Sequence, residues 1–280
     1  MQDDIPEELR RLIQKEVDKY NNMPHPDFEG YSPKAMAFLI HDPFNAESPV
    51  WFNKLSADDL EKVPLFRQVY YLASLINEMK EIKLTATGKL TIKIINDILS
   101  RKFIKLKMPA PPLLKKQYRE DDIHSIGLTR ILLEICGVTK KSSKKLELSR
   151  KGKKLLTDKQ EFFRVMFENY TTKFNWAYGD YFGNEAIGQL AWLFSVSLVA
   201  KYGNKFRTFE FYSEKYFKAF PMLLEDQYSL TLSHISYSHR FLERFMHYMG
   251  LVEIDYPDDY HDSPKIKKSP LFGKFVRVRF

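Results

Sequence analysis

Residues 122–149 read DIHSIGLTRILLEICGVTKKSSKKLELS, and they contain the clearest structural signal in the chain. Apolar residues recur at helical spacing from Asp122 to Cys136, which predicts a helix. Its expected apolar face consists of Ile123, Ile126, Ile131, Leu132 and Ile135. Gly137 follows at the position where helices often end in a left-handed conformation. Val138–Ser149 is then expected as a β-hairpin with its tip at Lys140–Lys145.

The residues before this run predict further elements in a defined order. Ser56–Lys62 opens with the capping pattern Ser-x-x-Asp, and Pro64–Lys80 has the apolar spacing of a helix. A short strand is expected at Ile82–Thr85 and another helix from residue 90 to about residue 102. A basic, proline-containing insertion at 103–121 separates this helix from the next one. The predicted order is therefore helix, strand, helix, helix, hairpin.

The same order is expected again in the second half. A linking helix at Asp158–Tyr170 leads into the aromatic stretch Phe174–Phe182. The aromatic residues between Phe162 and Phe220 are expected to form the interface between the two units rather than a base-stacking platform. The next predicted elements are a helix at Glu185–Tyr202 capped by Asn184, a strand at Thr208–Phe211, a helix from Ser213 to about Phe220, a helix at His234–Met249, and strands at Leu251–Tyr256 and Lys274–Phe280.

The N-terminal residues form a separate helical segment in this prediction. Glu7–Asn22 is a polar helix whose stripe of Leu9, Leu12, Ile13 and Val17 is expected to dock on the body, and a short helix begins at Ser32 and runs through His41. We predict a mainly α protein with small β-hairpins, an α+β fold. Its expected parts are an N-terminal helical segment (1–55), a first unit (56–157), a linking helix with an aromatic connector (158–183) and a second unit (184–280).

This order resembles winged-helix domains, a variant of the helix-turn-helix fold. The junctions Leu84-Thr85-Ala86-Thr87-Gly88 and Leu148-Ser149-Arg150-Lys151-Gly152 are similar to the Leu-Thr-x-x-Gly junction of many bacterial winged-helix regulators. In such a junction Thr or Ser can cap the helix and Gly eases the turn. The resemblance implies two winged-helix units and DNA binding, with the third helix in the major groove and the wing on the phosphates.

A second resemblance covers the first third of the chain. Asp27–Pro33, His41–Phe44 and Lys83–Thr85 are similar to an uncharacterised group of bacterial proteins, which implies no activity. The gap at 103–121 is longer than the turn of a helix-turn-helix, which counts against groove insertion by the first unit.

The net charge of +8 is unevenly distributed. Arg101–Arg119, Lys140–Lys154 and Pro264–Phe280 together carry +20, so the remaining residues carry −12. Local basic patches on an otherwise acidic molecule are the weaker form of the nucleic-acid signature. Lysine-rich turns that merely face solvent are the alternative.

Composition excludes several classes of protein. A single cysteine rules out a disulfide framework and any multi-cysteine metal site. Met1–Glu8 carries four acidic residues, which is unlike a signal peptide, and Ala186–Ala200 is too short to span a membrane, so a cytoplasmic protein is expected. The chain lacks the usual nucleotide, hydrolase and metalloprotease motifs, and we expect no catalytic site, cofactor or metal.

The candidate nucleic-acid-binding residues fall on three predicted elements. Phosphate contacts are expected from the first hairpin and the helix behind it, through Lys140, Lys141, Lys144, Lys145, Arg150 and Lys151. Base contacts are expected from the third helices, through His124, Ser125, Thr129 and Arg130 in the first unit and Arg240 and Arg244 in the second. An ordinary solvated helix face remains the alternative for both helices.

Together these features predict a non-enzymatic winged-helix DNA-binding protein, for which a regulatory role is one option. The alternative is a winged-helix protein-interaction scaffold that binds no nucleic acid, because the same fold also serves as a pairing module.

Overall fold

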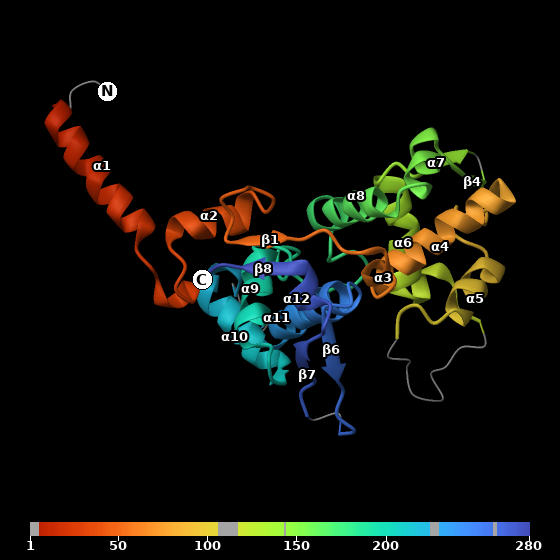
Figure 1. Cartoon of the computed structure of the whole chain (residues 1–280). Coiled ribbons are helices and arrows are strands. Elements are labelled where there is room, and N and C mark those ends of the chain that lie inside the picture. The colour runs from red at the N-terminus through yellow and green to blue at the C-terminus, as the bar shows by residue number, and fades with distance from the viewer. Residues whose placement is uncertain (1–5, 106–116, 143, 225–229, 260–261) are drawn as a thin grey trace.

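The computed structural model describes residues 6–105, 117–142, 144–224, 230–259 and 262–280. Within these residues helices dominate, and the strands form small antiparallel sheets (Figure 1). The prediction of a mainly α fold with small β-hairpins is confirmed. The prolines of the predicted insertion, Pro109, Pro111 and Pro112, lie outside the described residues, as does the hairpin tip residue 143.

The first unit has the expected order of elements. It comprises α3 (Ala57–Leu60), α4 (Pro64–Met79), β2 (Glu81–Lys83), α5 (Ile92–Ser100), α6 (His124–Ile135), β3 (Thr139–Ser142), β4 (Lys145–Leu148) and α7 (Arg150–Leu156). A short 3-10 turn, Glu120–Asp122, precedes α6. β4 lies between β2 and β3, so the strand before α5 adds to the hairpin that follows α6. Gly137 has a φ of +68°, as expected for the residue that ends α6.

The second unit repeats this order. Its elements are α9 (Trp192–Tyr202), β5 (Arg207–Thr208), α10 (Phe209–Ala219), α11 (Leu230–Tyr237), the π-helix η5 (Ser238–His247), β6 (Val252–Asp255) and β7 (Lys265–Lys268). The central strand is again the last one of the hairpin, because β7 lies between β5 and β6. The two units therefore share both the order of their elements and the order of strands in their sheets.

Two predicted helix starts in the second unit are wrong. The helix predicted from Glu185 begins only at Trp192, because Gly188 and Ala191 have φ values of +86° and +51°, which a right-handed helix does not contain. α10 starts at Phe209 with Thr208 as its N-cap, whereas Ser213, the predicted cap, lies buried inside the helix.

The strand expected at Lys274–Phe280 does not belong to the sheet of the second unit. β6 pairs with β7, and the C-terminal strand β8 (Val276–Val278) follows the short helix α12 (Phe272–Phe275). β8 pairs instead with β1 (Val50–Phe52), a strand that the sequence analysis does not predict. This pairing joins the N-terminal segment to the C-terminal end of the chain.

The first helix, α1 (Glu7–Asn22), has the predicted bounds but not the predicted packing. None of its residues is buried, and Leu12 in the middle of the apolar stripe is 56% exposed. In Figure 1 α1 projects away from the rest of the molecule, beyond α2 (Pro33–His41). The expectation that the stripe docks on the body is therefore wrong.

Glu29 connects the N-terminal segment to the second unit through hydrogen bonds and ion pairs. Its carboxylate accepts hydrogen bonds from Lys201, Lys215 and Tyr202. Burial alone would raise the pKa of Glu29, but these three donors lower it to about 2. The carboxylate is therefore charged at neutral pH, and the ties to α9 and α10 are charge-assisted.

The linking helix α8 (Lys159–Thr172) joins the hydrophobic cores of the two units. Its Phe162 packs edge-on against Phe66 of α4, with ring centroids 5.9 Å apart. Its Phe167 contacts Phe275 at 5.1 Å and Trp192 of the second unit at 5.9 Å. The buried apolar residues form one continuous cluster. Rings of α8, together with the buried Phe174 and Trp176, belong to this cluster, whereas Tyr178 and Tyr181 of the predicted aromatic interface are 45% and 99% exposed and do not.

Candidate nucleic-acid interface

The first hairpin carries the predicted basic wing, but two of its lysines have acidic partners. Cross-strand pairing places Lys140 opposite Glu147 and Glu147 opposite Glu81 on one face of the sheet. The Lys140 ammonium lies 3.2 Å from the Glu147 carboxylate, and that of Lys145 lies 2.7 Å from Glu81. These two lysines are partly neutralised within the protein. The strand register shows which lysines lie beside a carboxylate, whereas the number of basic residues in the hairpin does not.

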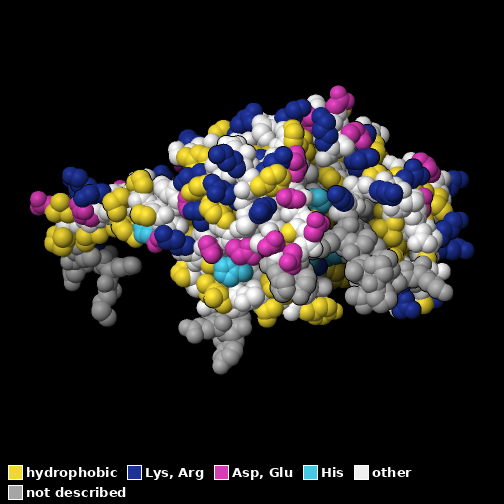
Figure 2. Space-filling view, turned by 90° about the horizontal axis from the view of Figure 1, so that it is seen from below, with side chains coloured by type: hydrophobic (Ala, Val, Ile, Leu, Met, Phe, Trp, Pro, Cys, Tyr) yellow, Lys and Arg dark blue, Asp and Glu magenta, His cyan; other side chains and the backbone are white. Residues whose placement is uncertain are grey.

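The other basic residues of this region are exposed and have no ion-pair partner among the described residues. We call them the basic end: Lys83, Lys141, Lys144, Arg150, Lys151, Lys153 and Lys154. Figure 1 places the hairpin and α7 at the upper right of the molecule. Figure 2, seen from below, shows Lys and Arg side chains at this right-hand end as well as over the middle of the visible face. Lys83 is an addition to the predicted set, since β2 adds to the hairpin and presents it beside Lys145.

Local packing fixes α7 against the hairpin. The Ser149 hydroxyl accepts a hydrogen bond from the Gly152 amide and donates one to the Gly137 carbonyl. A Cβ at Gly152 would lie only 2.0 Å from the Val138 carbonyl oxygen, so only glycine permits this approach. The Ser149–Gly152 junction seen in the sequence therefore positions the basic side chains of α7 next to those of the wing.

The third helix of the first unit does not present the predicted base-contacting residues to solvent. α6 packs between α4 and α8, and Ser125, Thr129 and Arg130 are buried. Gln68 of α4 donates to the Ser125 carbonyl and the Thr129 hydroxyl, at 2.9 and 2.8 Å. The prediction that these side chains lie outside the apolar face is wrong, because Ser125 and Thr129 lie on the side of α6 that contacts α4, and Arg130 is bound by the buried Glu120.

Arg130 is held by acidic residues of its own unit. Its Nε lies 2.8 Å from a carboxylate oxygen of the buried Glu120, and its Nη1 donates to Glu134 one turn further along α6. Both partners stabilise the guanidinium inside the protein. Arg130 is therefore a structural residue in this conformation and not a free phosphate or base contact.

His124 is also enclosed. Its ring lies 6.3 Å from the ring of Phe174 and 6.1 Å from that of Tyr248, so it packs at the seam between the two units. Neither ring nitrogen has a hydrogen-bond partner among the described residues, and both are buried. Burial, reinforced by the nearby positive charge of Arg244, lowers the pKa of His124 well below its ordinary value. The ring is neutral at pH 7, and its two nitrogens do not reach solvent.

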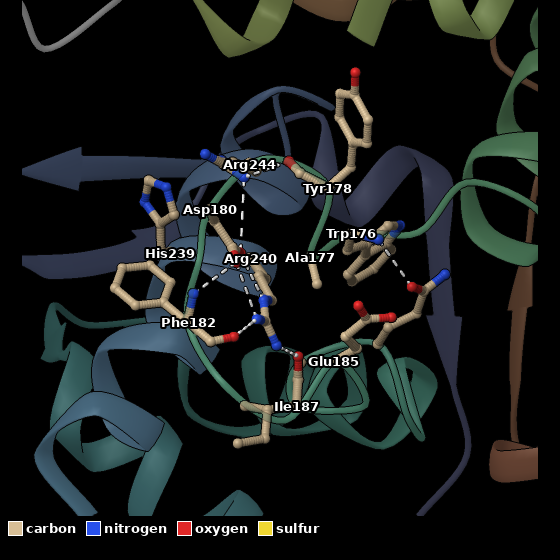
Figure 3. A network of polar contacts seen from close by, with 12 residues as sticks. Trp176, Ala177, Tyr178, Asp180, Phe182, Glu185, Ile187, His239, Arg240 and Arg244 are labelled. Carbon is tan, nitrogen blue, oxygen red and sulfur yellow. Dashed lines mark hydrogen bonds and ion pairs between the residues drawn. The ribbon is translucent and has the colours of Figure 1, made fainter. Parts of the chain in front are cut away.

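Arg240 of the second unit occupies the centre of a buried polar network (Figure 3). It is fully buried and donates to both carboxylate oxygens of Asp180, at 2.7 and 3.1 Å. It also donates to the backbone carbonyls of Phe182, Asn184 and Ile187. This guanidinium organises the irregular stretch before α9, and the prediction that it faces DNA is wrong.

Arg244 lies one turn further along η5 and is buried as well. Its Nη1 is 3.8 Å from Asp180 and 3.5 Å from the Tyr178 carbonyl oxygen. Burial lowers the pKa of Arg244 below its ordinary value. Two buried arginines thus share one carboxylate, and neither offers a contact to a base edge.

The second hairpin is less acidic than its first strand suggests. Glu253 of β6 pairs with Lys267 of β7 at 3.0 Å. β7 also carries Lys265 and Lys268, so the hairpin presents charges of both signs. Glu147 is the one acidic residue of the first hairpin, so this hairpin is the more basic of the two.

Other kinds of site are not apparent in the described part of the chain. No group of three or more His, Cys, Asp and Glu side chains there is placed to hold a metal ion, and no helix there is long and apolar enough to cross a membrane. Cys136 is buried, and burial raises the pKa of its thiol to about 12. The thiol is therefore protonated at neutral pH and poorly suited to act as a nucleophile.

Comparison with known proteins gives no assignment. No family model, no curated protein and no solved structure matches the chain.

Proposed function

We propose that the chain is a non-enzymatic DNA-binding protein built from two winged-helix units, and that the basic end binds the phosphate backbone. The observation that carries this proposal is the set of exposed Lys and Arg side chains on the first hairpin and α7 that lack acidic partners among the described residues. Such side chains release counterions when they neutralise phosphates, which is the main source of sequence-independent affinity for DNA.

The burial of the third helices limits the kind of binding that we propose. Base edges are read by side chains that enter a groove, whereas phosphate contacts position a protein without reading sequence. The polar side chains of α6 and η5 at the predicted recognition positions are engaged inside the protein. We therefore propose backbone binding with little sequence preference.

The test is the salt dependence of binding to an arbitrary duplex. Replacing Lys144 and Arg150 with alanine removes two unpaired charges of the basic end. Each lost phosphate contact should flatten the slope of log affinity against log salt by about 0.9, so the double variant should lose up to about 2 units of slope. A control of equal charge is Lys34→Ala/Lys205→Ala, which alters exposed lysines of α2 and the second unit. An unchanged slope in Lys144→Ala/Arg150→Ala would remove the basic end from the proposal.

A protein-interaction scaffold is the second candidate, and the enclosed third helices favour it. If the wild-type chain binds no duplex even at low salt, and instead forms a stable protein complex that resists salt, the scaffold replaces DNA binding as the proposed function. The salt series therefore separates the two candidates.

A further inference from the structure

An aromatic groove runs along β1 on the side away from β8. It has a volume of about 500 Å³ and lies between the extended residues 50–55 and helix α8. All of 50–55 line it, whereas no residue of β8 does. Figure 1 shows this extended segment passing below α8 on its way to α3. The groove is separate from the basic end.

The backbone of β1 offers unused hydrogen-bonding groups to this groove. Asn53 donates to the Phe275 carbonyl, and Arg279 donates to the Pro49 carbonyl, so the odd-numbered residues of this segment face β8. In an antiparallel pair the alternate residues direct their N–H and C=O groups to the opposite edge. The Phe52 N–H, the Phe52 C=O and the Val50 C=O therefore point away from β8, and no described residue bonds to them.

The floor of the groove is a cluster of rings. Phe52 lies 4.8 Å from Phe167 and 5.0 Å from Phe275, and Phe163 lies 5.5 Å from Phe275. Phe44 and Trp51 at the rim are 45% and 46% exposed. An exposed apolar surface next to a free strand edge is suited to apolar side chains that alternate along an added strand.

The wall formed by α8 is acidic. Glu161, Arg164 and Glu168 of α8 and its N-cap Asp158 line it and carry a net charge of −2. Lys54 lines the groove from the β1 segment, which leaves the whole lining at −1. Arg164 already donates to both Glu161 and Glu168, so it is not available to an incoming carboxylate. A ligand in the groove should therefore have basic side chains where it passes this wall.

From these features we infer that the groove binds an extended peptide of a partner protein by strand addition to β1. The peptide alternates apolar side chains, which enter the aromatic floor, with Lys or Arg side chains, which face the acidic wall. Main-chain hydrogen bonds to Val50 and Phe52 hold it in register.

Trp51 provides the readout, because the other two tryptophans, Trp176 and Trp192, are only 2% and 4% exposed. The probe is an array of hexapeptides with Phe, Leu, Ile or Val at alternate positions and Lys between them. Binding should protect Trp51 fluorescence from quenching by acrylamide. If no member of the array protects Trp51 at about 1 mM, the inference is overturned.

The best peptide is then made in two N-methylated forms, one methylated at its apolar positions and one at its Lys positions. Alternate N–H groups of a strand point to opposite edges, so strand addition predicts that only one form loses affinity, by roughly tenfold or more. Equal binding of the two forms would mean that the groove is a side-chain pocket for small apolar ligands. If Trp51 becomes protected as the protein concentration rises without any peptide, a second copy of the chain fills the groove. Either result overturns the inference.

A protein variant gives an independent check without altering the buried floor. Phe44→Ala removes a half-exposed ring at the rim and should weaken peptide binding by roughly tenfold. Phe206→Ala removes a ring of similar exposure in the second unit and should leave binding unchanged. Equal affinity of wild type and Phe44→Ala would place the peptide elsewhere.

Discussion

Arg240 makes five hydrogen bonds inside the second unit, two of them to Asp180. Replacing it with methionine keeps much of its volume but leaves the buried Asp180 and three backbone carbonyls without this donor. Breaking a buried ion pair in this way costs about 3–5 kcal/mol, so Arg240→Met should lower the free energy of unfolding by that amount in urea denaturation. The exposed Arg150→Ala should change it by less than about 0.5 kcal/mol. A similar small effect for Arg240→Met would show that the network is dispensable.

Arg240 also shows why only part of the candidate site could be predicted from the sequence. The amphipathic pattern places Arg240 opposite Phe241 and Phe245, which is usually the solvent side of a helix. The carboxylate that pairs with it, Asp180, lies 60 residues earlier. That stretch is irregular, so no apolar periodicity indicates where Asp180 lies. By contrast, the lysines of the first hairpin were predictable as exposed, because a local turn alone determines their position.

His124 should make stability depend on pH. Its folded-state pKa lies well below the ordinary value of 6.5, so below pH 6.5 the unfolded chain binds a proton that the folded chain does not. Stability must therefore fall as the pH falls from about 6.5 towards the folded-state pKa, by up to about 1.4 kcal/mol per pH unit for one histidine.

His124→Phe should remove this contribution. Because neither ring nitrogen has a partner among the described residues, the variant loses no hydrogen bond and should be at least as stable as wild type at pH 7.5. Urea denaturation between pH 7.5 and 5.0 should show a smaller loss of stability for the variant than for wild type. Burial also lowers the pKa of His234 and His247, but both residues are present in both proteins and cancel in the comparison. Parallel pH profiles would contradict the assignment to His124.

At the scale of elements, two helical glycines should respond to alanine with opposite signs. A Cβ at Gly152 of α7 would clash with the Val138 carbonyl at 2.0 Å, whereas a Cβ at Gly127 of α6 would meet only Glu120 at 3.8 Å. Gly152→Ala should destabilise the protein by about 1–3 kcal/mol through overpacking. Gly127→Ala should stabilise it by about 0.5–1 kcal/mol, because alanine restricts the unfolded chain. Thermal melting should give a lower melting temperature than wild type for Gly152→Ala and a higher one for Gly127→Ala. A stabilised Gly152→Ala would contradict the close packing of α7.

Element order was more predictable than element boundaries and partners. Apolar periodicity located α4 and α8 because each buries an apolar stripe. It also located α6, but α6 is buried on more than one face, and Ile131 and Ile135 of its predicted apolar face are only partly buried. It misplaced the start of α9, where positive φ values interrupt an apolar run that has no proline. It missed β1 because a strand of three residues is too short to show an alternation of apolar and polar residues. The partner of β1 lies more than 220 residues further along the chain, and such a pairing depends on tertiary packing.

At the scale of the whole molecule, the two units should behave as one cooperative body. α8 contributes rings to the cores of both, and the Tyr170 hydroxyl at its C-terminal end donates to the Arg244 carbonyl at 2.7 Å. Separate winged-helix modules joined by a flexible linker would unfold independently. With a continuous core, unfolding of one unit exposes the aromatic surface that the other unit shares with it. The second unit is thereby destabilised, and the two should unfold together.

Tryptophan fluorescence can test this coupling, because all three tryptophans, Trp51, Trp176 and Trp192, lie outside the first unit. Leu132→Ala leaves a cavity at a fully buried position of α6 and should lower the free energy of unfolding by about 2–5 kcal/mol. If the units unfold together, the urea midpoint seen by tryptophan fluorescence must fall as far as the midpoint seen by far-ultraviolet circular dichroism. Leu198→Ala in α9 should shift both signals equally as well. A fluorescence midpoint that stays at the wild-type value in Leu132→Ala, with a two-step dichroism curve, would show that the aromatic contacts of α8 do not couple the units.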